Sequence, residues 1–313
     1  MLAVDGVSFE VPAGSFFVVM GLSGSGKSTL IRCLNRLVEP TAGEVLIDGT
    51  DVLALDAAEL REARRTRIGM VFQHFALLPH RTVRQNVEFG LKIRGVVPAE
   101  RRAAADEALG VVGLARWGDY RPSALSGGMK QRVGLARALA SQTEILLMDE
   151  PFSALDPLIR KDMQDEMVEL QRRFRKTIVF ITHDLHEALR LGDRVAIMKE
   201  GRFVQTGTPE AIVRSPEDPY VAAFTQDVDR GRVITAATLM REPVPEHRAA
   251  DGAIAAGAPI ADAYGACGSG LPVPVVDAGG QCVGSLHPED VFAELSRSPE
   301  MEAPSAGRPA APG

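Results

Sequence analysis

The sequence predicts an α/β fold, and two observations predict it. The first is the opening order of a strand, a glycine-rich turn and a helix. Ser15–Met20 is a short apolar run rich in β-forming residues, which indicates a buried strand. A glycine-rich turn follows, and then the segment TLIRCLNRL, in which Leu30, Leu34 and Leu37 share one helical face. This order of elements recurs in α/β folds.

The second observation is that later apolar runs alternate with helical patterns. Three runs continue the predicted sheet, at Ile145–Met148, Thr177–Thr182 and Val195–Met198. Apolar residues at three- and four-residue steps indicate a helix between them, at Ile159, Met163, Met167 and Leu170. The segment Lys199–Arg202 has the composition of a hairpin turn that leads into FVQTG.

Composition shifts along the chain predict how it is divided. Between about residues 81 and 135, Ala, Arg and Glu recur at helical spacing, which predicts an inserted helical subdomain within a main domain of residues 1–228. Residues 229–296 are rich in Ala, Gly and Pro, but LPVPVVDAGGQCVGSLHPEDVFAEL predicts a strand, a Gly-Gly turn, a strand and a helix. Residues 297–313 have the composition of a disordered tail.

The charge balance excludes some function classes. The net charge is -6 and the pI is about 5.6, which argues against nucleic acid as a partner, because phosphate backbones need a basic surface. No apolar run approaches the roughly 20 residues that span a bilayer, and the first residues lack the pattern of a signal peptide. We therefore expect a cytoplasmic chain that meets a membrane only through a partner.

A glycine-rich loop carries the strongest chemical signal. Residues 21–28, GLSGSGKS, match the pattern GxxxxGK[ST], in which backbone N–H groups wrap phosphates and the next helix points its positive end at them. Lys27 is expected to pair with the β- and γ-phosphates, and Ser28 to hold Mg²⁺ with Thr29 beside it. The alternative is a glycine-rich turn with an incidental lysine. The predicted phosphate-binding residues are Gly21, Ser23, Gly24, Ser25, Gly26, Lys27, Ser28 and Thr29.

Two further motifs follow. The apolar run Ile145–Met148 ends in Asp149 and Glu150, which suits an acid that holds Mg²⁺ followed by a general base that polarises the attacking water. The segment LSGGMKQR then opens a helix, so that Ser126, Gly127 and Gly128 form a second anion-binding helix start. Alone, this segment could be a simple helix cap with a loose turn.

With these motifs in order, the chain resembles the ATP-binding cassette (ABC) family from about Val4 to Tyr220, and LSGGMKQR is similar to its signature sequence. The resemblance implies a P-loop NTPase core with an antiparallel β subdomain. It also implies that Gln73 is the Q-loop residue, which senses Mg²⁺ and the transmembrane partner. Asp156 then belongs to the D-loop at the subunit interface, and His183 is the switch histidine that contacts the γ-phosphate.

The resemblance also implies partners. In this family the signature of one subunit closes over the ATP bound by the other, so it implies a homodimer with ATP and Mg²⁺ at the interface. It further implies a separate transmembrane permease, an indirectly linked substrate-binding protein, and a peripheral position on the cytoplasmic face of the inner membrane.

Within the family, the chain is similar to quaternary-amine importer ATPases, and FTQDVDRGRV is the most discriminating segment. The implied cargo is glycine betaine, proline betaine, carnitine or choline. The alternatives are an importer of another small solute, such as amino acids, and a soluble ABC ATPase outside transport. Residues 229–296 resemble part of a CBS module, either regulatory or a degenerate appendage. Family members usually begin with a further strand and an adenine-stacking aromatic residue, so adenine is held otherwise here unless the natural start lies upstream.

Overall fold

The computed structural model of the chain describes residues 2–73, 77–153, 155–244 and 252–296. The chain divides into two compact units, Met1–Phe203 and Val204–Gly313, each with its own hydrophobic core. The division falls inside strand β8 (Arg202–Gly207), before the boundary predicted after residue 228, which stays a prediction. The predicted disordered tail lies outside the described residues.

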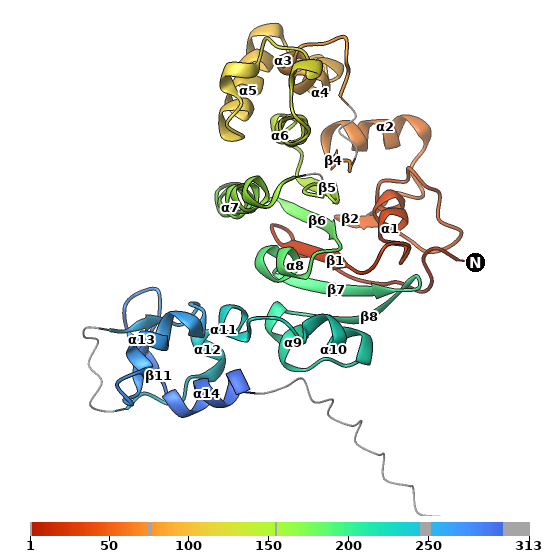
Figure 1. Ribbon diagram of the computed structural model, residues 1–313. Helices are drawn as coiled ribbons and strands as arrows, with labels where there is room; N and C mark the ends of the chain where they lie inside the picture. Colours follow the sequence, from red (N-terminus) through yellow and green to blue (C-terminus); the bar gives the residue numbers. More distant parts are fainter. Residues whose placement is uncertain (1, 74–76, 154, 245–251, 297–313) are drawn as a thin grey trace, which may run out of the picture. The chain divides into compact units, whose positions relative to one another are not determined.

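A six-stranded sheet has the order β4-β5-β6-β1-β7-β8, and all of its strands except β8, in which the division falls, belong to the first unit (Figure 1). Its strands are β1 (Phe16–Met20), β4 (Ile68–Val71), β5 (Ile145–Asp149), β6 (Thr177–Thr182), β7 (Arg194–Lys199) and β8. The neighbouring strands from β4 to β7 in this order pair in parallel. The loops that follow β1, β4, β5 and β6 therefore lie along one edge of the sheet, where ligands bind in open α/β sheets.

Burial explains why these runs form strands. All five residues of β1 are buried, as expected for a central strand of a parallel sheet that is covered on both faces. The core also receives partly buried residues of the N-terminal segment, and the ring of Phe9 stacks on Phe17 at 4.9 Å between centroids. The fully buried core of this unit includes Phe17, Val19, Leu30, Ile31, Ile68, Leu147, Val179, Ile181, Ala196 and Met198.

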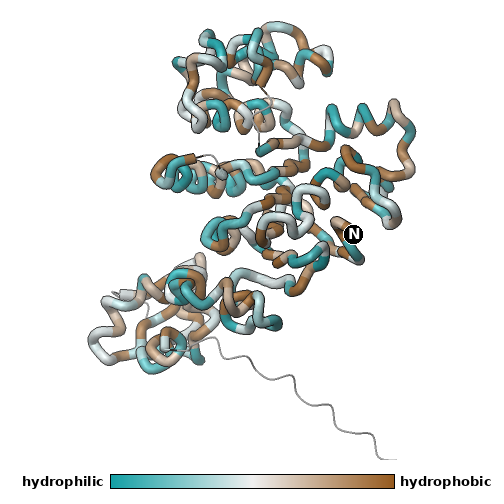
Figure 2. Tube along the Cα trace, turned by 45° about the vertical axis from the view of Figure 1, so that its right-hand side comes forward, coloured by the Kyte–Doolittle hydropathy of each residue, from teal (hydrophilic) through white to brown (hydrophobic). Residues whose placement is uncertain are grey.

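The first unit also contains several helices. They are α1 (Lys27–Leu34), α2 (Ala57–Thr66), α3 (Val83–Val87), α4 (Phe89–Ile93), α5 (Pro98–Val111), α6 (Gly127–Ala140), α7 (Pro157–Phe174) and α8 (Leu185–Leu191). In Figure 1, α3, α4 and α5 group beyond α6, and α6 packs against β4, so the predicted segment from 81 to 135 does contain a helical cluster. Figure 2 shows hydrophilic and hydrophobic residues alternating along the helices, as expected where one face is packed and the other is exposed.

One prediction about α1 is wrong. The helix ends at Leu34, and Leu37, which was expected on its apolar face, is 49% exposed. The cause is the local backbone: Arg36 adopts a left-handed conformation, with φ of 55°, and the N–H of Leu37 donates to the carbonyl of Arg32 at 2.8 Å. A left-handed residue followed by this six-to-one hydrogen bond terminates a helix.

The antiparallel elements agree with the predictions. The turn between β7 and β8 places Glu200 and Gly201 at positive φ, 50° and 84°, which is the two-residue hairpin turn that matches strand twist. A separate antiparallel ribbon joins β2 (Leu46–Ile47) to β3 (Thr50–Asp51).

The second unit combines short helices with a three-stranded sheet. Its order is β11-β10-β9, with β10 antiparallel to β11 and parallel to β9. The turn between β10 and β11 is held by Asp277, whose carboxylate accepts from the N–H groups of Gly279 and Gln281. This confirms the predicted strand, Gly-Gly turn, strand and helix. The elements are α9 (Pro209–Arg214), α10 (Pro219–Thr225), α11 (Arg230–Val233), α12 (Ala236–Leu239), β9 (Ile254–Ala255), α13 (Tyr264–Cys267), β10 (Val273–Val276), β11 (Cys282–Leu286) and α14 (Pro288–Ser296).

A buried ion pair joins three helices of this unit. Arg230 of α11 donates to the carboxylate of Glu294 on α14 and, at 3.0 Å, to the carbonyl of Val213 on α9. The side chains of Arg230 and Glu294 are only 9% and 4% exposed. Removing one partner of such a pair leaves the other charge buried without compensation, which costs more than the pair itself contributes.

We therefore predict that Glu294→Ala lowers the free energy of unfolding of the second unit by about 3–5 kcal/mol. Urea denaturation followed by circular dichroism measures this change. The matched control is Glu289→Ala on the same helix, where the Glu289 side chain is 70% exposed in its ion pair with Arg241, and the expected loss is about 1 kcal/mol or less. Equal losses in the two variants would contradict the assigned role of the Arg230 pair.

Candidate active site

The loop between β1 and α1 is shaped by its glycines. At Gly26, φ is 104°, and a Cβ atom there would lie 2.0 Å from the carbonyl oxygen of Ala3. At Gly21, a Cβ atom would lie 2.2 Å from the carbonyl oxygen of Met198. Side chains cannot be accommodated at either position, so the backbone path of the loop requires glycine. Ser23 and Gly24 are exposed at the loop tip, Ser25 is buried, and Thr29 is half-buried on α1.

Lys27 places a cation inside this loop. Its side chain is largely buried, and Nζ donates to the carbonyls of Gly21 at 2.7 Å and Leu22 at 2.9 Å. Burial lowers the pKa of Lys27, whereas the nearby carboxylates of Glu150 and Asp149 raise it. A buried ammonium group held by loop carbonyls is suited to an anion that brings its own oxygen atoms, such as a polyphosphate.

The next two predicted residues meet beside this loop. Asp149, the last residue of β5, is fully buried, and its Oδ1 accepts from the hydroxyl of Ser28 at 2.8 Å. The other oxygen, Oδ2, pairs with the guanidinium of Arg32 at 3.3 Å. A hydroxyl and a carboxylate in contact are oxygen ligands of the kind that Mg²⁺ takes, with phosphates and water completing its shell. The described residues contain no cluster of three His, Cys, Asp or Glu side chains suited to a metal ion.

Residues from three loops converge on Glu150. Its Oε2 lies 3.1 Å from Nδ1 of His183, which follows β6, and 3.4 Å from Nε2 of Gln73, which follows β4. The backbone of Glu150 has φ of 47°, an uncommon conformation for a residue with a side chain, and its N–H donates to the carbonyl of Ile181. Such strain concentrates at functional sites. The structure therefore brings together Gln73, Glu150 and His183, whose catalytic roles stay predictions.

The signature and D-loop residues lie at helix starts. Ser126 caps α6, its hydroxyl accepting from the N–H of Met129, and Ser126 and Gly127 are exposed. Asp156 is exposed and caps α7, with Oδ1 accepting from the N–H of Ile159 at 3.1 Å. Within the described part of this single chain, no hydrogen bond joins Ser126, Gly127 or Gly128 to residues 21–28.

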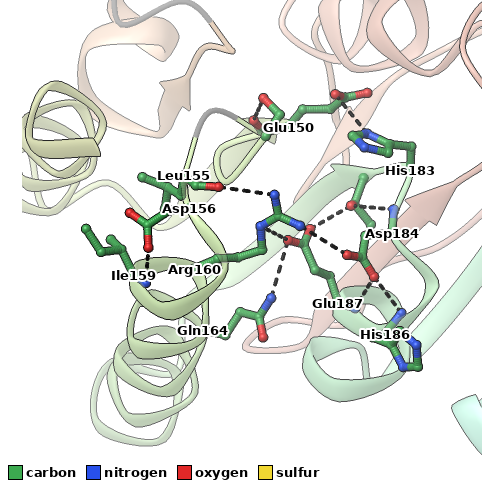
Figure 3. A network of polar contacts seen from close by, with 12 residues as sticks. Glu150, Leu155, Asp156, Ile159, Arg160, Gln164, His183, Asp184, His186 and Glu187 are labelled. Atoms are coloured by element: carbon green, nitrogen blue, oxygen red, sulfur yellow. Dashed lines mark hydrogen bonds and ion pairs between the residues drawn. The ribbon is translucent and has the colours of Figure 1, made fainter. Parts of the chain in front are cut away.

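The sequence reasoning missed several polar residues around this site. Arg32 could have been found, because it lies four residues after Ser28 and therefore on the same face of α1. A second set surrounds the turn that carries His183: Arg160, Gln164 and Glu187 belong to the network in Figure 3, and Thr182 donates to Glu187. No spacing rule links α7 to α8, so this network was visible only in the structure.

Among the helices of the described residues, none combines the length and the apolar character needed to cross a bilayer.

Comparison with known proteins gives the family. The sequence profile of the ABC transporter family matches residues 4–153. A glycine betaine/carnitine transport ATP-binding protein of Listeria monocytogenes is 57% identical over 242 residues, which cover 77% of this chain but only 61% of that relative. A trimethylamine N-oxide transport ATP-binding protein of Pelagibacter ubique is 49% identical over 293 residues, which cover 93% of this chain and 86% of that relative.

Solved structures of ABC transporter cassettes are similar to this chain. The dimeric structure of a bacterial ABC transporter cassette aligns with a TM-score of 0.63 and 38% identity, covering 66% of this chain and 90% of that one. The same cassette in a post-hydrolysis state, bound to ADP and phosphate, aligns with a TM-score of 0.62. The predicted α/β P-loop fold and the resemblance to betaine-type transport proteins are thereby confirmed. On the identity and coverage of these relatives, the chain belongs to the ABC transporter family of ATP-binding proteins.

Proposed function

We propose that this chain is the ATP-hydrolysing subunit of an importer for quaternary-amine osmoprotectants such as glycine betaine, proline betaine, carnitine or choline. The observation that carries the proposal is the meeting of the buried Lys27 ammonium, the Ser28–Asp149 pair and the Glu150–His183 pair along one edge of the sheet. These groups supply a cation for phosphates, oxygen ligands for a metal ion and a base for water.

The phosphates of ATP are the natural partners of the loop before α1. Lys27 now donates to the neutral carbonyls of Gly21 and Leu22, and bonds to charged phosphate oxygens are stronger. The N-terminus of α1 adds unpaired N–H groups and the positive end of the helix dipole. ATP binding therefore replaces weak internal bonds of the lysine with charge-assisted ones.

Mg²⁺ is the expected metal ion. Ser28 and Asp149 would hold it, with Gln73 as the third protein group near the γ-phosphate. When bound, it neutralises charge on the β- and γ-phosphate oxygens. Arg32 pairs with the Asp149 carboxylate and keeps it oriented toward Ser28.

Glu150 is the proposed general base. Its Oε2 accepts a proton from the attacking water, and Gln73 and His183 hold the same oxygen within 3.4 Å and 3.1 Å. His183 is positioned to contact the γ-phosphate while it orients Glu150. The left-handed backbone at Glu150 fixes where the carboxylate points.

A homodimer completes the proposed site. One chain has one 21–28 loop and one 126–128 helix start, and within the described part of the chain no hydrogen bond joins them. Two chains related by a two-fold axis place each exposed Ser126–Gly128 segment against the ATP of the other chain, with Asp156 at the same interface. A separate permease and, through it, a substrate-binding protein complete the importer at the cytoplasmic face of the membrane.

We predict that Glu150→Gln keeps ATP binding but lowers the hydrolysis rate by about 100-fold or more, because the base is lost while the phosphate contacts remain. The trapped ATP should hold a dimer, which light scattering with size-exclusion chromatography detects. Phosphate release and equilibrium ATP binding are the two measurements.

The matched control is Glu144→Gln, at the other end of β5, where the glutamate is 73% exposed and should not affect the rate. Lys27→Ala should instead lose ATP affinity itself, by about 10-fold or more, as charge-assisted phosphate bonds disappear. Normal hydrolysis by Glu150→Gln would refute the assignment of the base.

One observation favours trimethylamine N-oxide as a second candidate solute. The trimethylamine N-oxide relative of Pelagibacter ubique aligns over 93% of this chain, including its C-terminal part, and this chain covers 86% of it. The betaine/carnitine relative of Listeria monocytogenes is more identical but extends well beyond the match. Trimethylamine N-oxide and glycine betaine both carry a methylated nitrogen, so they belong to one chemical class.

The solute is tested in vesicles that contain the chain with its cognate permease and binding protein. Glycine betaine is expected to raise the ATPase rate severalfold, and trimethylamine N-oxide is the competing stimulant. A rate raised only by trimethylamine N-oxide would replace the first candidate by the second. A rate raised only by an amino acid would refute both.

Residues 229–296 are proposed as a partial CBS-like regulatory region that responds to ionic strength. The support is the β9, α13, β10, β11, α14 order, with its own buried core of Ile234, Ile260, Val275, Leu286 and Val291. Deleting residues from Val233 onward should change the salt dependence of transport and leave the ATPase rate of the isolated chain within about two-fold. An unchanged salt response would support an appendage without regulatory function.

A further inference from the structure

A buried carboxylate lies behind the proposed active site. Glu187 of α8 (Figure 3) is 4% exposed, and its Oε2 accepts from the hydroxyl of Thr182 at 2.6 Å. Its Oε1 accepts from Nε2 of Gln164 at 3.3 Å and lies 3.8 Å from Nε of Arg160. None of these side chains is among the groups proposed to touch ATP, Mg²⁺ or water.

Thr182 and Asp184 form the turn that carries His183. The N–H of Asp184 donates to the hydroxyl of Thr182 at 3.0 Å, and that hydroxyl donates in turn to Glu187. His183 lies between these two anchored residues, with Nδ1 3.1 Å from Oε2 of Glu150. The position of the imidazole therefore depends on the position of the Glu187 carboxylate.

Arg160 connects the same carboxylate to the loop before α7. Its guanidinium donates to the carbonyl of Leu155 at 3.2 Å and to Oδ2 of Asp184 at 3.4 Å. Its backbone N–H donates to the carbonyl of Asp156, so the residue is fixed to the first turn of α7. Figure 3 shows the guanidinium between the Leu155–Asp156 loop and the 182–187 turn.

The contact between Arg160 and Glu187 is longer than a hydrogen bond. Nε of Arg160 is buried and makes no hydrogen bond within the described residues, and it stands 3.8 Å from Glu187. A shift of less than about 1 Å would turn this ion pair into a hydrogen bond. Burial raises the pKa of Glu187, an effect opposed by its bonds to Thr182 and Gln164 and by the charge of Arg160. The arginine thus favours the charged form of the carboxylate.

We infer that Arg160 and Glu187 are positioning residues that link the Leu155–Asp156 loop to the turn that carries His183. The inference rests on the proposed function, in which Asp156 faces the second chain and His183 faces the γ-phosphate. Docking of the second chain against the loop then sets the position of His183 through the guanidinium and the carboxylate. Hydrolysis is thereby coupled to dimer closure without either residue touching ATP.

The test compares Arg160→Met with Arg190→Met in the full chain. Arg190 also bridges α7 and α8, donating to Gln164 at 3.3 Å and pairing with Asp165, but the structure gives it no contact with the Leu155 carbonyl or with Thr182. Arg160→Met is expected to lower kcat about 10-fold and to leave the KM for ATP within about two-fold, because ATP contacts remain. Arg190→Met is expected to leave both kcat and the KM for ATP unchanged.

A spectroscopic readout separates positioning from a general structural effect. The Cε1–H NMR signal of His183, identified by its loss in His183→Ala, is expected to shift in Arg160→Met and to stay in place in Arg190→Met. Glu187→Gln is the second variant, in case Arg160→Met folds poorly, and it should give the same loss of kcat and the same shift of the signal.

The results that would overturn this inference differ from the results that would refute the proposed function. Wild-type kcat in Arg160→Met and Glu187→Gln, or an unmoved His183 signal in both, overturns the inference. A fall in kcat of equal size in Arg190→Met also overturns it, because helix packing alone would then account for the effect. Failure of the wild-type chain to hydrolyse ATP, or ATP binding unchanged by Lys27→Ala, would instead refute the proposed function.

Discussion

The buried ammonium group of Lys27, next to the two acids at the end of β5, is the electrostatic arrangement on which the rest of the site depends. A buried cation whose hydrogen-bond partners are all neutral is costly, and the carboxylates of Glu150 and Asp149 raise a pKa that burial lowers. The parallel order of β5, β6 and β1 brings these charges together, because each strand delivers its loop to the same edge. The fold therefore supplies a positive centre that a polyphosphate can complete.

The parts of this site that the sequence predicted are those fixed by local chemistry. The backbone at Gly21 and Gly26 excludes side chains, so the loop pattern has a physical cause that can be read from residue types. The two acids at the end of β5 were predictable because an apolar strand rarely carries charged residues unless they have a partner, and Asp149, although buried, is paired with Ser28 and Arg32. Leu37 was predicted wrongly because helix periodicity cannot detect a left-handed residue that is not glycine, and Arg36 ends α1 in that conformation.

Contacts between helices could not be predicted in the same way. Asp184 and Glu187 match the capping-box spacing, in which the glutamate would accept from the N–H of the cap residue. Instead that N–H donates to Thr182, and Glu187 turns inward to the same hydroxyl and to Gln164 of α7. Packing of α8 on the sheet decides between these arrangements. The pair of Arg230 and Glu294 is likewise a product of tertiary packing, since no periodicity joins residues so far apart.

The Thr182 hydroxyl determines which groups donate and which accept in the hydrogen-bond network behind His183. A threonine hydroxyl has one proton, and here it accepts from the N–H of Asp184 and donates its own proton to Oε2 of Glu187. Glu187 Oε2 is the acceptor in this bond, a role that the charged carboxylate fills. Burial disfavours that charge, and the nearest positive group is Arg160, which also holds the Leu155 carbonyl. Thr182 and Arg160 thus both favour the charged form of Glu187, and Arg160 also donates to the loop before α7, so one guanidinium contacts both the carboxylate and that loop.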